Sequence, residues 1–102
     1  MKDIKKALKN GEVVIGVCCD ISDPSVVAIL GYTGWDYVII NCEGRTASPF
    51  GAELENLIRA AYIADITPVV KVPENDSAMV ASAVNLGAKI VEVPKVNTKV
   101  IG

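Results

Sequence analysis

The chain has 102 residues, enough for one domain with a buried core. Hydrophobic residues make up 51% and aromatic residues only 5%, so the apolar content is mainly aliphatic, which favours an α/β protein with buried parallel strands. Ten basic and twelve acidic residues are mixed along the chain and give a net charge of −2, which argues against nucleic acids and membrane surfaces as partners.

The start of the chain and its cysteines indicate a compartment. The opening MKDIKKALKNGE is too charged for a secretion signal, and the apolar runs are far shorter than the roughly 20 residues of a membrane-spanning helix. Cys18, Cys19 and Cys42 are an odd number at the ends of apolar runs, which favours reduced thiols in a cytoplasmic chain. We interpret them as buried structural thiols; a zinc site is the competing interpretation, but their spacing is not that of metal ligands.

The predicted elements alternate between apolar strands and amphipathic helices. The spacing of Ile4, Ala7 and Leu8 predicts a short first helix that stops at Gly11. Strands are predicted at 13–18, 37–40, 68–72 and 90–93, and helices follow the first three, two of them capped by Asp23 and Asp76. Each helix carries four apolar residues: Val26, Val27, Ile29 and Leu30 on the first, Leu54, Leu57, Ile58 and Ala61 on the second, and Met79, Val80, Ala83 and Val84 on the third. The four residues of the third helix are predicted to face inward.

Strands joined by helical crossovers of this kind are parallel, because such crossovers are right-handed. Two architectures satisfy the pattern: an open, doubly wound sheet, or part of a (β/α)8 barrel with strand order 1-2-3-4 and all helices outside. The turn after the first strand lacks the glycine-rich sequence of a nucleotide-binding sheet. We therefore expect an α/β fold in which residues 1–102 form a single partial barrel, its first half, with a flavodoxin-like open sheet as the alternative.

Polar residues follow each predicted strand, at the edge where barrel enzymes build their active sites. They are Asp20, Asn41, Glu43, Lys71, Glu74, Glu92 and Lys95. Lys71 interrupts an apolar strand, and strand alternation places it opposite Val70 and Val72. If the valines meet the helices, the ammonium points into the barrel, where it needs a partner such as Glu43 or Glu92.

Three roles remain open for Lys71: a structural ion pair, binding of a substrate carboxylate, and a Schiff base. Glu43 could act as a base, support a metal ligand, or only complete a turn. Trp35 and Asp36 precede the second strand, so we expect them at the bottom of the barrel, where they serve stability. The sequence has no histidine, so proton transfer within this chain must use a carboxylate, a lysine, a tyrosine or metal-bound water.

Several stretches match one family pattern over nearly the whole chain. They are 55–61, 66–76, 86–88 and 93–98, together with Gly16, Asp23-Pro24, Gly34-Trp-Asp36 and Ile40-Asn-Cys-Glu43. In combination they resemble the amino-terminal part of the HpcH/HpaI aldolases. The resemblance implies reversible aldol cleavage of 2-keto-3-deoxy or 4-hydroxy-2-oxo acids to pyruvate and an aldehyde, with a divalent metal, Mg2+ or Mn2+, that chelates the pyruvate enolate.

The chain departs from the family at several positions. The family's turn Asp-x-Glu-His reads Asn41-Cys42-Glu43-Gly44 here, and the aspartate that works with that histidine matches Asn85. The family's substrate-binding arginine matches Lys71, which keeps the charge but loses the bidentate fork. The family's metal ligands lie on later strands and have no counterpart here. The resemblance thus implies catalytic roles for Glu43 and Lys71, carboxylate binding by Lys71, and no metal ligand in this chain.

The resulting hypothesis is a truncated or divergent aldolase-family polypeptide that handles a small keto acid and an aldehyde. The alternative is a non-catalytic half-barrel that associates with itself. A four-stranded parallel sheet has two unpaired edges and one uncovered face, and its apolar surface needs a partner. We therefore expect a homo-oligomer.

Overall fold

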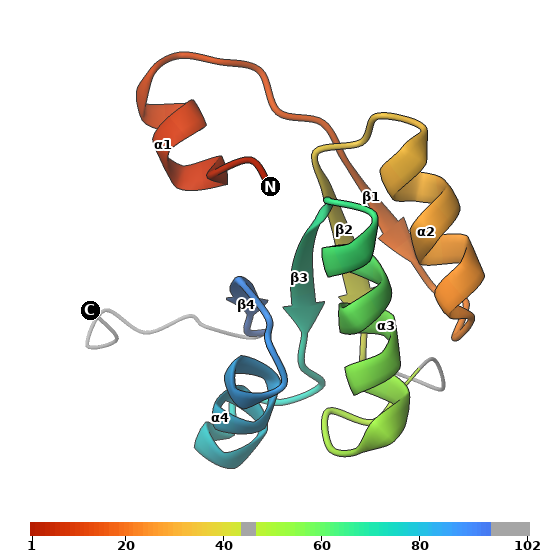
Figure 1. Cartoon of the computed structure of the whole chain (residues 1–102). Helices are drawn as coiled ribbons and strands as arrows, with labels where there is room; N and C mark the ends of the chain where they lie inside the picture. The colour runs from red at the N-terminus through yellow and green to blue at the C-terminus, as the bar shows by residue number, and fades with distance from the viewer. Residues whose placement is uncertain (44–46, 95–102) are drawn as a thin grey trace.

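A computed structural model describes residues 1–43 and 47–94 of the chain (Figure 1). Strands and helices alternate after a short first helix, as the sequence predicts. The elements are α1 (Ile4–Lys9), β1 (Gly16–Cys19), α2 (Pro24–Tyr32), β2 (Tyr37–Asn41), α3 (Ala52–Ile63), β3 (Thr67–Lys71), α4 (Ser77–Asn85) and β4 (Ile90–Glu92).

The four strands form one parallel sheet in the order β1-β2-β3-β4. Each strand thus lies beside its neighbour in the chain, as in a (β/α)8 barrel. A doubly wound sheet reverses its strand order at a switch point, and these four strands do not reverse. The predicted barrel order is confirmed, and the flavodoxin-like alternative is wrong for the described strands.

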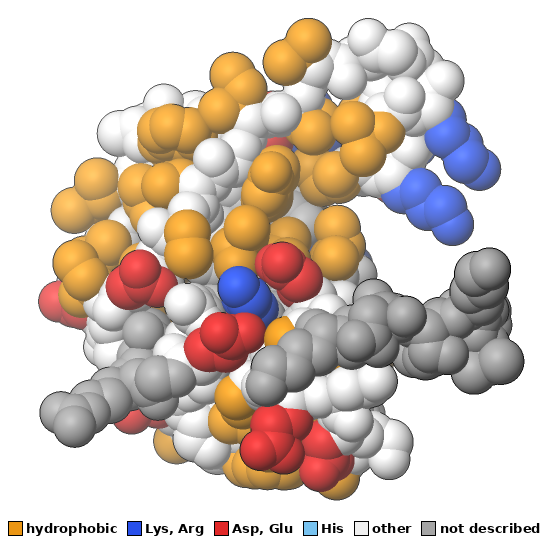
Figure 2. Space-filling view, turned by 180° about the vertical axis from the view of Figure 1, so that it is seen from behind, with side chains coloured by type: hydrophobic (Ala, Val, Ile, Leu, Met, Phe, Trp, Pro, Cys, Tyr) orange, Lys and Arg blue, Asp and Glu red, His pale blue; other side chains and the backbone are white. Residues whose placement is uncertain are grey.

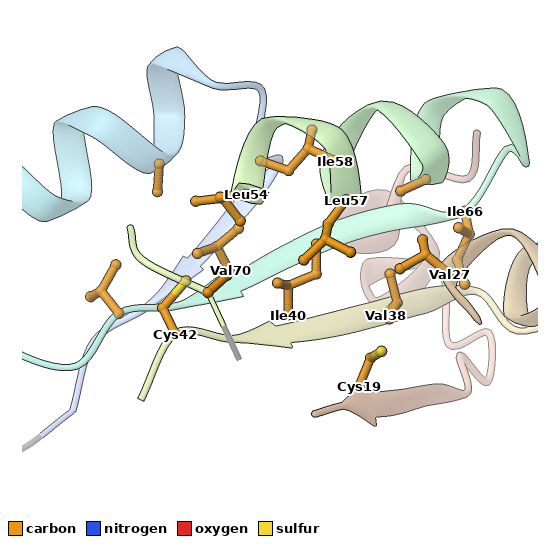
Figure 3. Close-up of a cluster of buried hydrophobic side chains, with 14 of the residues drawn as sticks. Cys19, Val27, Val38, Ile40, Cys42, Leu54, Leu57, Ile58, Ile66 and Val70 are labelled. Atoms are coloured by element: carbon orange, nitrogen blue, oxygen red, sulfur yellow. The ribbon is translucent and has the colours of Figure 1, made fainter. Parts of the chain in front are cut away.

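The core lies between one face of the sheet and helices α2, α3 and α4. Figure 3 shows Val38, Ile40 and Val70 of the strands directed toward Leu54, Leu57 and Ile58 of α3. Full burial of a leucine or isoleucine side chain contributes about 1.5–3 kcal/mol to folding. Since all four predicted core residues of α3 are buried, this helix supplies much of the contact that holds the sheet.

The helix starts agree with the predicted caps. The Asp23 side chain accepts a hydrogen bond from the Ser25 amide at 2.9 Å, and the Asp76 side chain accepts one from the Ala78 amide at 2.7 Å. These carboxylates satisfy amides that the first turn of a helix leaves without a backbone partner. Gly87 follows α4 with a φ of 114°, the left-handed conformation expected of a glycine there.

Other expectations need correction. Strand β1 occupies Gly16–Cys19 rather than 13–18, and each of the other strands differs from its predicted range at one end or both. Val84 of α4, which the sequence predicts to face inward, is exposed, and so is Leu8 of α1. The buried residues of α1 are Ile4 and Ala7, and the buried residue of α4 is Ala83.

Helix α1 lies apart from the other helices, at the end of the sheet where the strands begin (Figure 1). Asp36 connects this end: its carboxylate accepts a hydrogen bond from the Ile15 amide at 2.9 Å and pairs with the Lys2 ammonium at 3.2 Å. The Thr67 hydroxyl donates to the Lys2 carbonyl at 3.1 Å. Asp36 therefore fastens the start of the chain to the sheet, in agreement with its expected place at the bottom of the barrel.

Within the described residues, no helix is both long enough and apolar enough to cross a bilayer.

Candidate active-site edge of the sheet

The sheet has a second face that α2, α3 and α4 do not cover, which we call the open face. The strand register arranges its side chains in three rows, from the start of the strands to their ends. The rows are Gly16, Tyr37 and Thr67, then Cys18, Ile39, Val69 and Ile90, and last Asn41, Lys71 and Glu92. Figure 2 shows hydrophobic side chains gathered on this side of the molecule, next to a basic side chain flanked by acidic ones. The open face therefore changes from apolar to charged toward the carboxyl ends of the strands.

Lys71 ends β3 on the open face, opposite the buried Val70 and Val72. Its ammonium lies 3.7 Å from the Glu43 carboxylate, and the two side chains are 32% and 38% exposed. A partly exposed pair at this distance contributes only about 0–1 kcal/mol to stability. Of the two expected partners of Lys71, Glu43 makes the ion pair, whereas Glu92 is its neighbour in the β3–β4 register.

A second polar contact links the ends of β1 and β2. The Asn41 side-chain amide donates a hydrogen bond to the Asp20 carboxylate at 3.2 Å, and the Asn41 oxygen accepts one from the Glu43 amide at 2.8 Å. Asn41 thus holds the turn that carries Glu43. Beside it, the Ser22 hydroxyl donates to Glu53 of α3 at 2.7 Å, which fixes the loop after β1.

The three thiols differ in exposure. Cys19 and Cys42 are buried, as predicted, and burial raises the pKa of Cys42 to about 11. The prediction is wrong for Cys18, which is exposed on the open face with its sulfur 3.7 Å from the Asp20 carboxylate. Desolvation raises the pKa of Cys18, and the neighbouring Asp20 charge raises it further. The sequence held a signal for this, because adjacent strand residues such as Cys18 and Cys19 face opposite sides.

Other predicted residues lie away from this cluster or outside the described chain. Asn85 ends α4 and lines a groove between α3 and α4, with Arg59 and Tyr62, on the helix-covered side of the sheet. Glu74 is exposed in the loop after β3. Gly44 and Lys95, and the part of the family pattern from 95 to 98, lie outside the described residues. The described structure therefore brings together Asp20, Asn41, Glu43 and Lys71.

The described residues do not fit a divalent metal ion by themselves. Within 1–43 and 47–94, no three Cys, Asp or Glu side chains gather closely enough to hold one. The two carboxylates nearest the centre of the cluster already have polar partners, Asp20 with Asn41 and Glu43 with Lys71. Magnesium and manganese prefer several oxygen ligands in a regular arrangement, which this cluster does not supply.

Among residues 1–43 and 47–94, the side chains that form the ion pair of the charged cluster, Lys71 and Glu43, are both partly exposed. A hollow of about 410 Å³ lies at the opposite end of the sheet, between α1 and the starts of β3 and β4. An ammonium with one loosely held carboxylate can bind a small anionic group, but a substrate site also needs walls that exclude water. A Schiff-base lysine is activated in a desolvated pocket, whereas the Lys71 side chain is 32% exposed among the described residues.

The fold and this edge define the class of the protein: consecutive βα units of a parallel (β/α)8 barrel with charged residues at the carboxyl ends of the strands. No family model matches the chain. A curated hydroxypyruvate/pyruvate aldolase of Roseobacter denitrificans is 26% identical to it over 98 residues, which are 96% of this chain and 38% of that relative.

Solved structures show the same likeness. The HpcH/HpaI aldolase from Desulfitobacterium hafniense superimposes with a TM-score of 0.70 at 31% identity, over 83% of this chain and 32% of that one. The citrate synthase SbnG superimposes with a TM-score of 0.79 at 31% identity, over 86% and 35%. The resemblance to the HpcH/HpaI aldolases is confirmed, and the chain spans about a third of the length of the relatives that it matches.

Proposed function

We propose that the chain is the keto-acid-binding part of a pyruvate aldolase, truncated or divergent relative to its relatives. The reaction would be the reversible aldol cleavage of a 2-keto-3-deoxy or 4-hydroxy-2-oxo acid to pyruvate and an aldehyde. The observation that carries the proposal is the Lys71 ammonium, which lies on the open face 3.7 Å from Glu43. The aldolase names of the relatives support the same reaction class.

Lys71 would bind the carboxylate of the keto acid by charge-assisted hydrogen bonds. Glu43 would position the ammonium through the ion pair, and Asn41 would hold the Glu43 turn in place through the 2.8 Å hydrogen bond to the Glu43 amide. The pair is weak, so an incoming carboxylate can compete for the ammonium at small cost. This makes a ligand-binding role a better account of Lys71 than a stabilising one.

A divalent metal ion belongs to the proposal only as a cofactor whose ligands come from outside the described residues.

We also propose that the chain acts in the cytoplasm as a homo-oligomer. The three free thiols support the compartment. Cys18 and Ile90 are exposed in the middle row of the open face, which supports association, because isolated soluble domains rarely leave a large apolar surface exposed.

Two measurements test the proposal. The first is pyruvate binding by the 102-residue chain, monitored through NMR chemical shifts. The second is product formation from pyruvate and an aldehyde in the presence of Mg2+ or Mn2+. Lys71→Ala should weaken pyruvate binding by at least about tenfold, the equivalent of one charge-assisted contact. Lys9→Ala, which removes the same charge from an exposed position on α1, serves as the control. Equal binding by both variants, together with absent product, would remove the proposed role.

A further inference from the structure

Asp20 directly follows β1 and lies level with the charged row of the open face. The β1–β2 register continues past its last pair to place Asp20 beside Asn41, and the β2–β3 register pairs Asn41 with Lys71. The Asn41 side-chain amide donates to the Asp20 carboxylate at 3.2 Å, which places both groups on the same side of the sheet. Asp20 and Lys71 therefore stand on either side of Asn41, at the carboxyl ends of β1 and β3.

The spacing between β1 and β3 suits a small keto acid. Neighbouring strands lie about 4.8 Å apart, and β2 lies between these two, so their backbones are roughly 10 Å apart. A keto acid needs roughly 8 Å between the ammonium that binds its carboxylate and the base that removes a proton from C3, with a contact of about 3 Å at each end. A substrate whose carboxylate is held by Lys71 can therefore extend across Asn41 toward Asp20.

Other titratable groups of the charged cluster suit this proton transfer less well. Glu43 is engaged by the Lys71 ammonium at 3.7 Å, and Glu92 lies only one strand spacing from Lys71. Desolvation raises the pKa of the Cys18 thiol, so this thiol keeps its proton at neutral pH and acts as a donor to Asp20. The sequence has no histidine, the residue most often used as a general base. Asp20 is therefore the best-placed base among the described residues of the cluster.

We propose that Asp20 is the proton-transfer group of the keto-acid site, an inference that rests on the aldolase function proposed above. The Asp20 carboxylate takes a proton from C3 of pyruvate bound at Lys71. The electron pair of the broken C–H bond forms the C2–C3 double bond of the enolate, whose negative charge lies on the keto oxygen. The enolate then attacks the carbonyl carbon of the aldehyde. Without an aldehyde, Asp20 returns the proton to C3, so in D2O the pyruvate methyl group gains deuterium.

Two quantities measured on the same NMR samples in D2O with Mg2+ test this role: pyruvate binding, from the chemical shifts of the chain, and the loss of the pyruvate methyl proton signal. Asp20→Asn keeps an oxygen that accepts from Asn41 and removes a negative charge, so it should bind pyruvate at least as tightly as the natural chain. Its exchange should be at least about 100-fold slower, as expected for the loss of a general base. Glu74→Gln, the same change at an exposed carboxylate outside the cluster, should leave both quantities unchanged.

A further measurement needs no variant and decides the matter if Asp20→Asn fails to fold. In a chain labelled with carbon-13, pyruvate should shift the Asp20 carboxyl signal and the Lys71 side-chain signals with the same dissociation constant. Pyruvate that shifts Lys71 but leaves Asp20 unmoved, exchange that Asp20→Asn does not slow, or no exchange by the natural chain would overturn the role of Asp20. The proposed binding at Lys71 fails separately, if Lys71→Ala binds pyruvate as the natural chain does.

Discussion

The Lys71 ammonium meets the Glu43 carboxylate across the ends of neighbouring strands, at 3.7 Å and with both side chains partly exposed. A partner held so loosely leaves the cation accessible to a second anion. We expect the affinity of the proposed carboxylate site to depend on the geometry of the N–H donors at position 71. A substitution at this position can change that geometry and keep the positive charge.

Lys71→Arg should bind pyruvate about tenfold more tightly than the natural chain. The guanidinium offers two parallel N–H donors to a carboxylate, whereas an ammonium acts as a point charge. Titration of pyruvate followed by NMR would measure the change, with Lys9→Arg as the control for a general effect of arginine. Weaker binding by Lys71→Arg than by the natural chain would contradict carboxylate recognition at this position.

Gly31→Ala should destabilise the fold by about 1–3 kcal/mol, the usual cost of overpacking. A Cβ on Gly31 would stand 2.5 Å from the Ala64 Cβ and 2.9 Å from the Ala64 carbonyl oxygen, where α2 approaches the end of α3. Alanine is a better helix former than glycine by about 1 kcal/mol, so a net loss of folding stability can come only from this contact. Urea unfolding gives the value. Ser25→Ala, on the exposed start of α2, should change stability by less than about 0.5 kcal/mol.

Asp36→Asn should lower stability at neutral pH and lose its effect in acid. The hydrogen bond from the Ile15 amide, and after it the Lys2 ammonium, lower the pKa of Asp36 from its ordinary value of 3.8. A carboxyl group whose pKa is lower in the folded chain stabilises it above the unfolded value, and this contribution is lost as the pH falls through the folded value. The free-energy difference between Asp36→Asn and the natural chain should therefore be constant above about pH 5 and shrink below pH 3.8.

The pH profile of urea unfolding checks this expectation. Glu12→Gln removes one acidic charge from an exposed side chain and controls for the change in net charge. A difference for Asp36→Asn that grows toward acid would show that the carboxylate does not stabilise the folded chain.

Thiol alkylation of the dilute native chain should modify Cys18 first and Cys42 last. Cys18 is exposed, whereas Cys42 is buried and burial raises its pKa to about 11, so about one thiol in a thousand is ionised there at pH 8. Mass spectrometry after a short exposure to iodoacetamide should show one label, and denaturation should allow three. Equal early labelling of Cys42 would mean that the strand end opens readily.

The sequence by itself determined the features that depend on neighbouring residues. The spacing of its apolar residues predicts helix α3, and Asp23 and Asp76 predict the starts of two other helices. Alternation along the strand predicts that Lys71 lies on the face opposite Val70 and Val72, away from the helices. These features follow from local backbone geometry and hydrogen bonding within a few residues, so a single sequence carries enough information to predict them.

Only the tertiary structure decided the contacts between distant segments. It selected Glu43 over Glu92 as the partner of Lys71 and joined Asn41 to Asp20 across 21 residues. It also separated Asn85 from this edge by placing it in the helical layer. The physical reason is that such contacts depend on strand register and on how helices pack over the sheet, which are set by the whole chain together.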